Sequence, residues 1–221
     1  MFGTLAQYEA PLRIRPRAVL VRVTCRSATP RRLSTTEVVA QTDSTRDEHG
    51  HALGGADIAV DAAHELVAAG MGTPEKMRDA TWRQRVDALG RAHYKRYDES
   101  TATALGEGAE LVLDRWQGDL RRLRDEAGRD PRAIRELLQE VPRLGPTGAD
   151  IFCREVQGIW TELQPALDGK ARQGAEKLGL PTDPDELARL VRKPDLPRLA
   201  AALTRAALDA DVRHAVDEGT E

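Results

Sequence analysis

The sequence has few aromatic residues, only two cysteines and no long apolar run. Aromatic residues make up 4% of the 221 residues and apolar residues 40%, so we expect a core built mainly from leucine, alanine and valine. Two distant cysteines, Cys25 and Cys153, are too few for a four-cysteine zinc site or an iron–sulfur cluster. No run approaches the roughly 18 apolar residues of a membrane span. These absences predict a soluble, cytoplasmic protein that needs no metal or other cofactor.

The chain also lacks an excess of positive charge. Its formal net charge is −3 at pH 7, whereas a protein that coats nucleic acid non-specifically usually carries a clear basic excess. Any contact with nucleic acid must therefore come from a local patch of the surface or from backbone amides.

The composition changes near residue 55. Residues 1–55 place arginines among proline, serine and threonine, and residues 41–50 are polar and rich in helix breakers. We expect a largely disordered N-terminal tail, within which Ala18–Val23 has the pattern of a short strand. A DNA-clasping arm, or a segment read from a start codon assigned too early, would give the same composition.

Residues 56–221 predict an all-α fold, a compact multi-helix domain. Alanine, leucine, arginine and glutamate dominate, and all four favour helix. The apolar periodicity and the Thr-Pro and Asp-Pro capping pairs predict a series of helices. We expect these helices over residues 57–70, from 74 with the pattern continuing over 82–89, 100–116, 131–140, 147–163, 166–178, 184–191 and 196–215. The three tryptophans, Trp82, Trp116 and Trp160, fall on apolar faces and are expected in the core.

The segment Val141-Pro-Arg-Leu-Gly-Pro-Thr-Gly-Ala-Asp150 predicts two helices joined by a tight turn. The turn is centred on Leu144-Gly-Pro146, and glycine tolerates its backbone angles. The first amides of the second helix have no partner within the helix and point outward, and the helix dipole adds positive potential there. Such amides suit a DNA phosphate without any net positive charge. An ordinary helix corner with a Gly-Pro break is the alternative.

Two motifs resemble the endonuclease III-type superfamily of DNA glycosylases. The turn is similar to the family's L-P-G-V-G-x-K-T-A hairpin. The segment Pro165-Ala-Leu-Asp-Gly-Lys-Ala-Arg-Gln-Gly-Ala-Glu-Lys-Leu-Gly-Leu180 resembles the family's V-D-(T/G)-(H/N)-V-x-R-V-x-x-R-L-G, and the resemblance spans about residues 72–180. It implies a domain with a helix-hairpin-helix motif, here divergent and without the iron–sulfur cluster of some members.

The resemblance places Asp168 on the family's catalytic aspartate. Excision of a flipped-out base breaks a glycosidic bond through an oxocarbenium-like state, and a nearby carboxylate stabilises the developing charge or activates water. A helix N-cap is the alternative role of Asp168, and the two roles are compatible. Family members that also cut the strand carry a hairpin lysine that forms a Schiff base. The matching residue here is Thr147, so we do not expect strand-cutting lyase activity.

The expected DNA contacts lie mainly in the turn and on its flanks. Arg143 replaces the family's first hairpin glycine and is a candidate phosphate contact, although a solvated surface arginine is the alternative. The remaining candidates are Leu144, Gly145, Thr147, Gly148, Lys170, Tyr94 and Tyr97, the tyrosines because aromatic and basic residues interleave around them.

The leading hypothesis is a base-excision-repair-type DNA-binding protein, a monofunctional DNA glycosylase-like enzyme that cleaves an N-glycosidic bond. Its partner would be double-stranded DNA held by phosphate contacts, with nucleoid association if the source is bacterial. No counterpart of the family's glutamine-containing loop, which helps to fill the hole left by a flipped base, precedes the Thr-Pro segment. This favours the alternative, a non-catalytic helix-hairpin-helix DNA-binding protein. A helical protein-interaction module is a third hypothesis.

Overall fold

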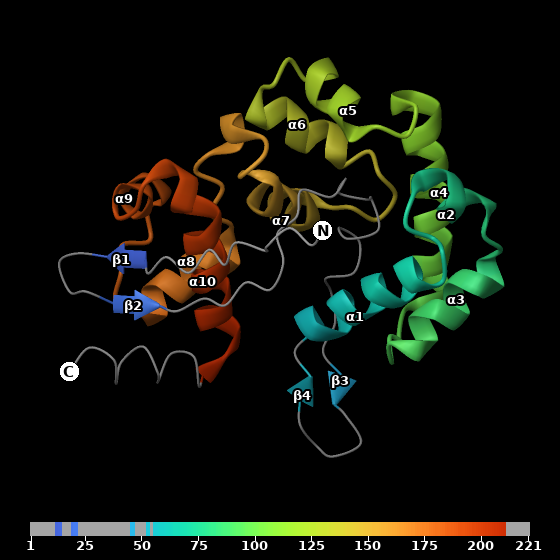
Figure 1. Cartoon of the computed structure of the whole chain (residues 1–221), viewed down its shortest axis with the longest axis horizontal. Helices are drawn as coiled ribbons and strands as arrows, with labels where there is room; N and C mark the ends of the chain where they lie inside the picture. Colours follow the sequence, from blue (N-terminus) through green and yellow to red (C-terminus); the bar gives the residue numbers. More distant parts are fainter. Residues whose placement is uncertain (1–11, 15–18, 22–44, 47–51, 54, 211–221) are drawn as a thin grey trace, which may run out of the picture. The chain divides into compact units, whose positions relative to one another are not determined.

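The computed structural model describes the backbone of residues 12–14, 19–21, 45–46, 52–53 and 55–210, and the side chains of residues 58–210. Every regular element within 55–210 is a helix, which confirms the predicted all-helical fold for this part of the chain (Figure 1). The helices are α1 (Gly55–Ala68), α2 (Pro74–Asp79), α3 (Trp82–Arg91), α4 (Asp98–Trp116), α5 (Leu120–Glu126), α6 (Pro131–Leu138), α7 (Pro146–Val156), α8 (Gly169–Lys177), α9 (Pro184–Arg189) and α10 (Leu196–Leu208), with two 3-10 turns, η2 (Thr161–Leu163) and η3 (Lys193–Asp195).

Short strands occur before the helices. Strand β1 (Leu12–Ile14) pairs antiparallel with β2 (Val19–Val21), with Arg13 opposite Leu20, and β3 (Thr45–Arg46) pairs with β4 (Ala52–Leu53). Strand β2 lies inside the strand-like run that the sequence predicted. Apart from these four strands and Gly55, the expected tail over residues 1–55 lies outside the described residues.

The chain divides into two compact units. We call Arg32–Cys153 the N-terminal helical unit, and Met1–Arg31 with Arg154–Glu221 the C-terminal helical unit. The division falls inside α7, so the domain expected over residues 56–221 contains two units. Each is described separately below.

Helix starts follow the capping chemistry that the sequence predicted. The side chain of Thr73 accepts a hydrogen bond from the amide of Lys76 at the start of α2. Asp130 caps α6 and Asp183 caps α9 in the same way, each with proline at the next position. A short polar side chain at this position satisfies amides that the helix leaves unpaired, and proline there loses no hydrogen bond.

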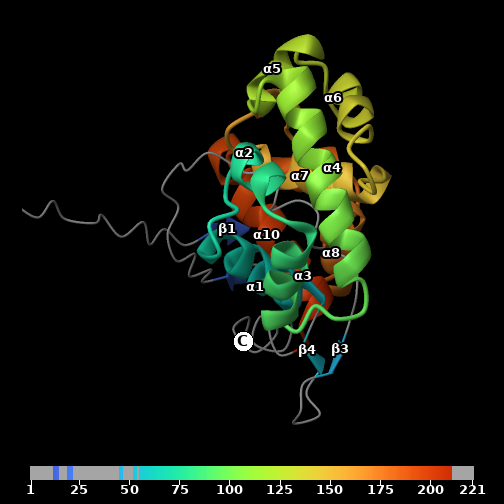
Figure 2. The ribbon, with the colours of Figure 1, turned by 90° about the vertical axis from the view of Figure 1, so that its right-hand side faces the viewer.

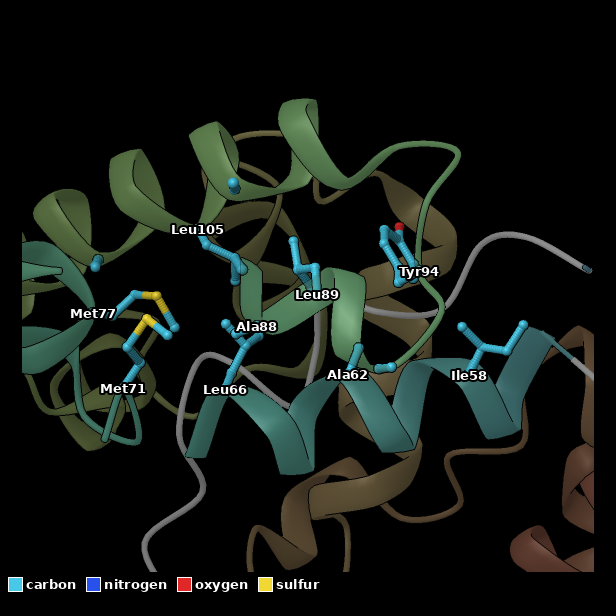
Figure 3. Close-up of a cluster of buried hydrophobic side chains, with 12 residues drawn as sticks. Ile58, Ala62, Leu66, Met71, Met77, Ala88, Leu89, Tyr94 and Leu105 are labelled. Atoms are coloured by element: carbon cyan, nitrogen blue, oxygen red, sulfur yellow. The ribbon is translucent and has the colours of Figure 1, made fainter. Parts of the chain in front are cut away.

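The core of the N-terminal helical unit forms where α1, α3 and α4 pack together. Figure 3 shows the side chains of α1 directed toward those of α3, with Leu105 of α4 on the other side of α3 and the two methionines beside them. These residues are Ile58, Ala62, Leu66, Met71, Met77, Ala88, Leu89 and Leu105. The long helix α4 also carries α5 near its C-terminal end, and α6 follows beside it (Figure 2). The unit therefore has the leucine- and alanine-rich core that the composition predicted.

Among residues 58–153 of this unit, one charged residue is buried. Arg85 donates from Nη1 to the carbonyl oxygens of Met77 and Ala80, at 2.9 and 2.8 Å, and so caps the last turn of α2. Burial lowers the pKa of Arg85 below its usual range. Gly106 leaves space for the guanidinium, because a Cβ there would lie 2.7 Å from Arg85 Nη2.

The C-terminal helical unit is built on the contact between α8 and α10. Gly174 lies directly against the backbone of α10, where a Cβ would overlap the carbonyl oxygen of Leu203. Lys177 of α8 donates from Nζ to the carbonyl oxygen of Ala207 at 2.8 Å. Leucines and alanines of α8, α9 and α10 fill the space around this contact.

Candidate functional site

The turn between α6 and α7 lies where the sequence placed it (Figure 1). Helix α6 ends at Leu138, and α7 begins at Pro146. The Leu144 amide donates to the Val141 carbonyl oxygen at 3.0 Å, and the Ala149 amide donates to the Gly145 carbonyl oxygen at 3.0 Å. These bonds close the turn and start the second helix.

Arg143 has a left-handed backbone in the middle of this turn. Its φ is +63°, a region that side chains other than glycine rarely adopt. The side chain is exposed, and within residues 58–210 it has no carboxylate partner. The arginine therefore stands on a backbone conformation that suits glycine, with its charge directed to solvent.

The amides at the start of α7 are available to a ligand. Across the described part of the chain, the amides of Gly145, Thr147 and Gly148 have no hydrogen-bond acceptor. Gly145 and Thr147 are exposed, and Gly148 is half-buried. Pro146, which lies between Gly145 and Thr147, has no N–H and therefore contributes no donor. The positive end of the α7 dipole lies at the same place, and an anion is the ligand that such a group binds best.

Apolar contacts beneath the turn fix its shape. Leu144 is buried over Gly148, where a Cβ would lie 2.5 Å from Leu144 Cδ1. Val141 is buried against Gly108 of α4, where a Cβ would lie 3.3 Å from Val141 Cγ1. Leu144 was a candidate DNA contact, but its side chain is buried and its amide already donates to Val141, so Leu144 offers a phosphate no free donor.

An ion pair joins the two helices on either side of the turn. Arg135 of α6 donates from Nε to Asp150 of α7 at 2.8 Å. Nearby on α7, Cys153 is fully buried, and burial raises the pKa of its thiol to about 11. The second helix of the turn is therefore held to α6 by an ion pair beside a buried residue.

Asp168 lies in the C-terminal helical unit and has donors on both oxygens. Its Oδ1 accepts the amide of Ala171 at 2.9 Å, which makes it the N-cap of α8. Its Oδ2 accepts from Arg154 Nη1 at 2.7 Å. The two side chains are only 6% and 4% exposed. The same Arg154 nitrogen reaches the hydroxyl of Thr204 at 3.3 Å, so the pair ties α7, α8 and α10 together.

The sequence reasoning assigned no role to Arg154. Its partner Asp168 lies fourteen positions further along the chain, outside the one-turn spacings at which ion pairs are read from a helical sequence. The expected N-cap role of Asp168 was the part that local sequence could predict.

The remaining candidates differ in exposure. Tyr94 is 8% exposed, and its hydroxyl lies 3.2 Å from the Thr101 hydroxyl, so its ring is in the core rather than on a surface that could stack on a base. Tyr97 is 39% exposed, with the Arg96 guanidinium 5.3 Å from its ring centroid. Of this pair, only Tyr97 remains a surface candidate.

Lys170 is exposed at the start of α8, and its Nζ donates to Gln173 at 3.1 Å. It belongs to the C-terminal helical unit together with Asp168, whereas the turn residues and both tyrosines belong to the N-terminal helical unit. The structure thus brings together the candidates from Arg143 to Gly148 as one surface.

Three further findings are negative. Within the described residues, no group of three or more histidine, cysteine or acidic side chains is placed to hold a metal ion. No helix in the same part of the chain is long and apolar enough to cross a membrane. Comparisons with protein-family models, curated proteins and solved structures each gave no significant match. Functional inference therefore depends on the geometry of the residues above.

Proposed function

We propose that the chain binds duplex DNA and that α6, the turn and α7 form a helix-hairpin-helix motif of the endonuclease III type. The observation that carries the proposal is the left-handed backbone of Arg143. In the similar family motif this position holds the first hairpin glycine. The chain keeps the conformation that glycine would adopt, although the side chain is now arginine.

The chemistry of the turn supports a phosphate as the group that is bound. Gly145, Thr147 and Gly148 offer unpaired amides at the positive end of a helix dipole. Arg143 adds a charged donor on the same turn, and hydrogen bonds from charged donors to phosphate are among the stronger ones. Contacts of this kind fix the position of the duplex but do not read its sequence. Binding therefore requires no basic excess, which accommodates the net charge of −3.

The test removes one amide without disturbing the helix. Thr147 is the second residue of α7, where proline keeps a helical φ and deletes an N–H that has no partner in the helix. We expect Thr147→Pro to weaken binding of a labelled duplex with an abasic-site analogue by about tenfold or more, since a hydrogen bond to a charged group is lost.

The matched control is Thr147→Ala, which keeps the amide and removes only the hydroxyl. We expect its affinity to stay within about twofold of the wild type, measured by fluorescence anisotropy at low salt. Absence of binding by the wild type, or equal losses in the two variants, refutes the proposal.

Base excision is the second candidate function, and it depends on Asp168. The observation in its favour is a carboxylate at the family's catalytic position that is held in one orientation by the amide of Ala171 and by Arg154. A fixed carboxylate beside a sugar stabilises an oxocarbenium-like state. Both oxygens already have donors, so excision requires Asp168 to give up Arg154 when substrate is bound. If Asp168 keeps its ion pair with Arg154 when DNA is bound, the same pairing favours the non-catalytic alternative.

Excision is tested with duplexes that carry a panel of damaged bases, comparing the wild type with Asp168→Asn. Product from the wild type that is lost in Asp168→Asn, with retained DNA affinity, supports a monofunctional glycosylase. Equal activity in the two removes Asp168 from the mechanism. No product from either, with DNA binding intact, leaves the non-catalytic DNA-binding protein. Strand cleavage is not proposed, because the hairpin offers Thr147 where a Schiff base needs a lysine.

A further inference from the structure

A cluster of charged side chains connects α4, α5 and the start of the hairpin. Arg115, in the last turn of α4, forms an ion pair through Nη2 with Glu126 of α5 at 2.5 Å. Its Nη1 forms a second ion pair with Glu140. All three side chains are partly exposed and belong to the N-terminal helical unit. One guanidinium therefore bridges two carboxylates from different parts of this unit.

The first half of the cluster is anchored in the core. Trp116 is 1% exposed and donates from its indole nitrogen to Glu126 Oε2 at 2.7 Å. The Arg115 guanidinium lies 5.2 Å from the Trp116 ring centroid, a cation–π contact. Both oxygens of Glu126 are therefore engaged, and the orientation of Arg115 is set by a buried tryptophan.

The second half of the cluster ends at the hairpin. Glu140 immediately precedes Val141, the first residue of the turn, whose side chain packs against Gly108 of α4. The Glu140 amide also donates to the Leu137 carbonyl oxygen at 3.2 Å. The last residues before the turn are thus held to α4 by an apolar contact and by an ion pair at adjacent positions.

We propose that Arg115 is a positioning residue for the hairpin: through Glu140 it holds the turn against α4, so that the amides of Gly145, Thr147 and Gly148 form one phosphate-binding surface. Arg115 acts through Glu140 rather than by touching DNA. This inference rests on the proposed function, because it assigns Arg115 and Glu140 to the same DNA-binding surface.

The test uses a substitution for which a positioning role and simple electrostatics predict opposite changes in DNA affinity. Glu140→Gln removes a negative charge beside a surface that binds an anion, so electrostatics alone raises DNA affinity. Loss of positioning lowers it. We expect Glu140→Gln to weaken duplex binding about two- to fivefold, the range of a partly exposed ion pair. The slope of affinity against salt stays that of the wild type, because no phosphate contact is removed.

The matched control is Glu136→Gln on the exposed face of α6. Within residues 58–210, Glu136 pairs only with the exposed Arg132, at 3.1 Å, so its loss removes one charge near the hairpin without touching the turn. We expect its affinity to equal or exceed that of the wild type. Glu140→Gln binding at least as tightly as Glu136→Gln overturns the proposal.

Hydrogen exchange provides a readout that does not depend on DNA. We expect the hydrogen-bonded amides of Leu144 and Ala149, which close the turn and start α7, to exchange several-fold faster in Glu140→Gln than in Glu136→Gln, with the rest of the unit unchanged. Equal exchange rates in the two variants overturn the positioning role. A wild type that binds no duplex refutes the proposed function instead, and the exchange rates then decide alone whether Arg115 and Glu140 order the hairpin.

Discussion

Replacement of Arg143 by glycine tests the feature of the hairpin on which the functional proposal depends. A left-handed backbone costs an L-residue about 1–2 kcal/mol, whereas glycine adopts it freely. Glycine loses more backbone freedom on folding, by about 0.5–1 kcal/mol relative to alanine. The difference predicts that Arg143→Gly is more stable than Arg143→Ala by about 0.5–1 kcal/mol. Both variants lose the same exposed side chain, so the comparison isolates the backbone.

The assay is urea unfolding followed by far-ultraviolet circular dichroism, with a control pair at Gln139. Gln139 is also exposed and near the turn, but its φ is −72°, where alanine is the favoured residue. We therefore expect the opposite order there, with Gln139→Ala more stable than Gln139→Gly by about 0.5–1 kcal/mol. The difference in unfolding free energy between the glycine and the alanine variant is thus expected to have opposite signs at two positions only four residues apart.

The reasoning is refuted if the alanine variant is at least as stable as the glycine variant at both positions. Arg143→Ala equal to or more stable than Arg143→Gly means that residue 143 is not left-handed in solution, and the likeness of the turn to a glycine hairpin is then lost. Both Arg143 variants also remove one cation from the proposed interface, so the salt dependence of duplex binding falls by about one counterion in each.

Three further predictions concern stability. Asp168→Asn keeps a good N-cap but leaves buried Arg154 with the more exposed Glu155 as its carboxylate partner, so the free energy of unfolding falls by roughly 1–3 kcal/mol, measured by urea unfolding; no loss means that Asp168 and Arg154 do not form a buried pair in solution. Gly174→Ala forces a methyl group into the α10 backbone and lowers the melting temperature by several degrees, whereas Gly169→Ala, with no atom within 4 Å, does not. Hydrogen bonds from Arg115 and Trp116 lower the pKa of Glu126 below its usual value of 4.5, so stability is lost as pH falls below about 4.5, and Glu126→Gln makes the loss of stability in acid less steep.

Helix starts were predictable because their causes are local. Thr73, Asp130 and Asp183 each satisfy amides within three residues along the chain, and proline follows each of them. Helix α5 was missed although Asp119 caps it, because its seven residues contain only two leucines and no apolar period to read. The expected helix over 147–163 stops at Val156 and gives way to a 3-10 turn, since the continued apolar pattern does not mark the break.

The expected burial of the tryptophans was correct for two of the three. Trp116 and Trp160 are buried as expected. Trp82 is 40% exposed, which contradicts the prediction of a core residue. It is the first residue of α3, and its indole N–H donates to the Glu99 carbonyl oxygen and the Thr103 hydroxyl instead of entering the core. A helical wheel shows which face of a helix carries a residue. It does not show whether a neighbouring helix covers that face at the end of the helix.

The polar contacts around the candidate sites were beyond the sequence because each joins residues distant along the chain. The partners of Arg115 and Arg154 are known only once helices are packed, and neither spacing has a pattern that marks it. Cap chemistry, by contrast, identified the position of Asp168 correctly. The sequence therefore located the turn and the start of α8, and the packing decided which of their side chains can reach a ligand.

The same ion pairs explain how an acidic chain can present a surface suited to DNA. Beside the turn, Asp150 is paired with Arg135 and Glu140 with Arg115, so the carboxylates nearest to the hairpin are compensated. What the turn itself exposes is a set of unpaired amides and the side chain of Arg143. Local potential at a binding surface depends on nearby charges within about a Debye length rather than on net charge. The overall charge of −3 consequently argues against coating of DNA along the whole surface, and the proposed binding would instead use a single phosphate-sized contact at the hairpin.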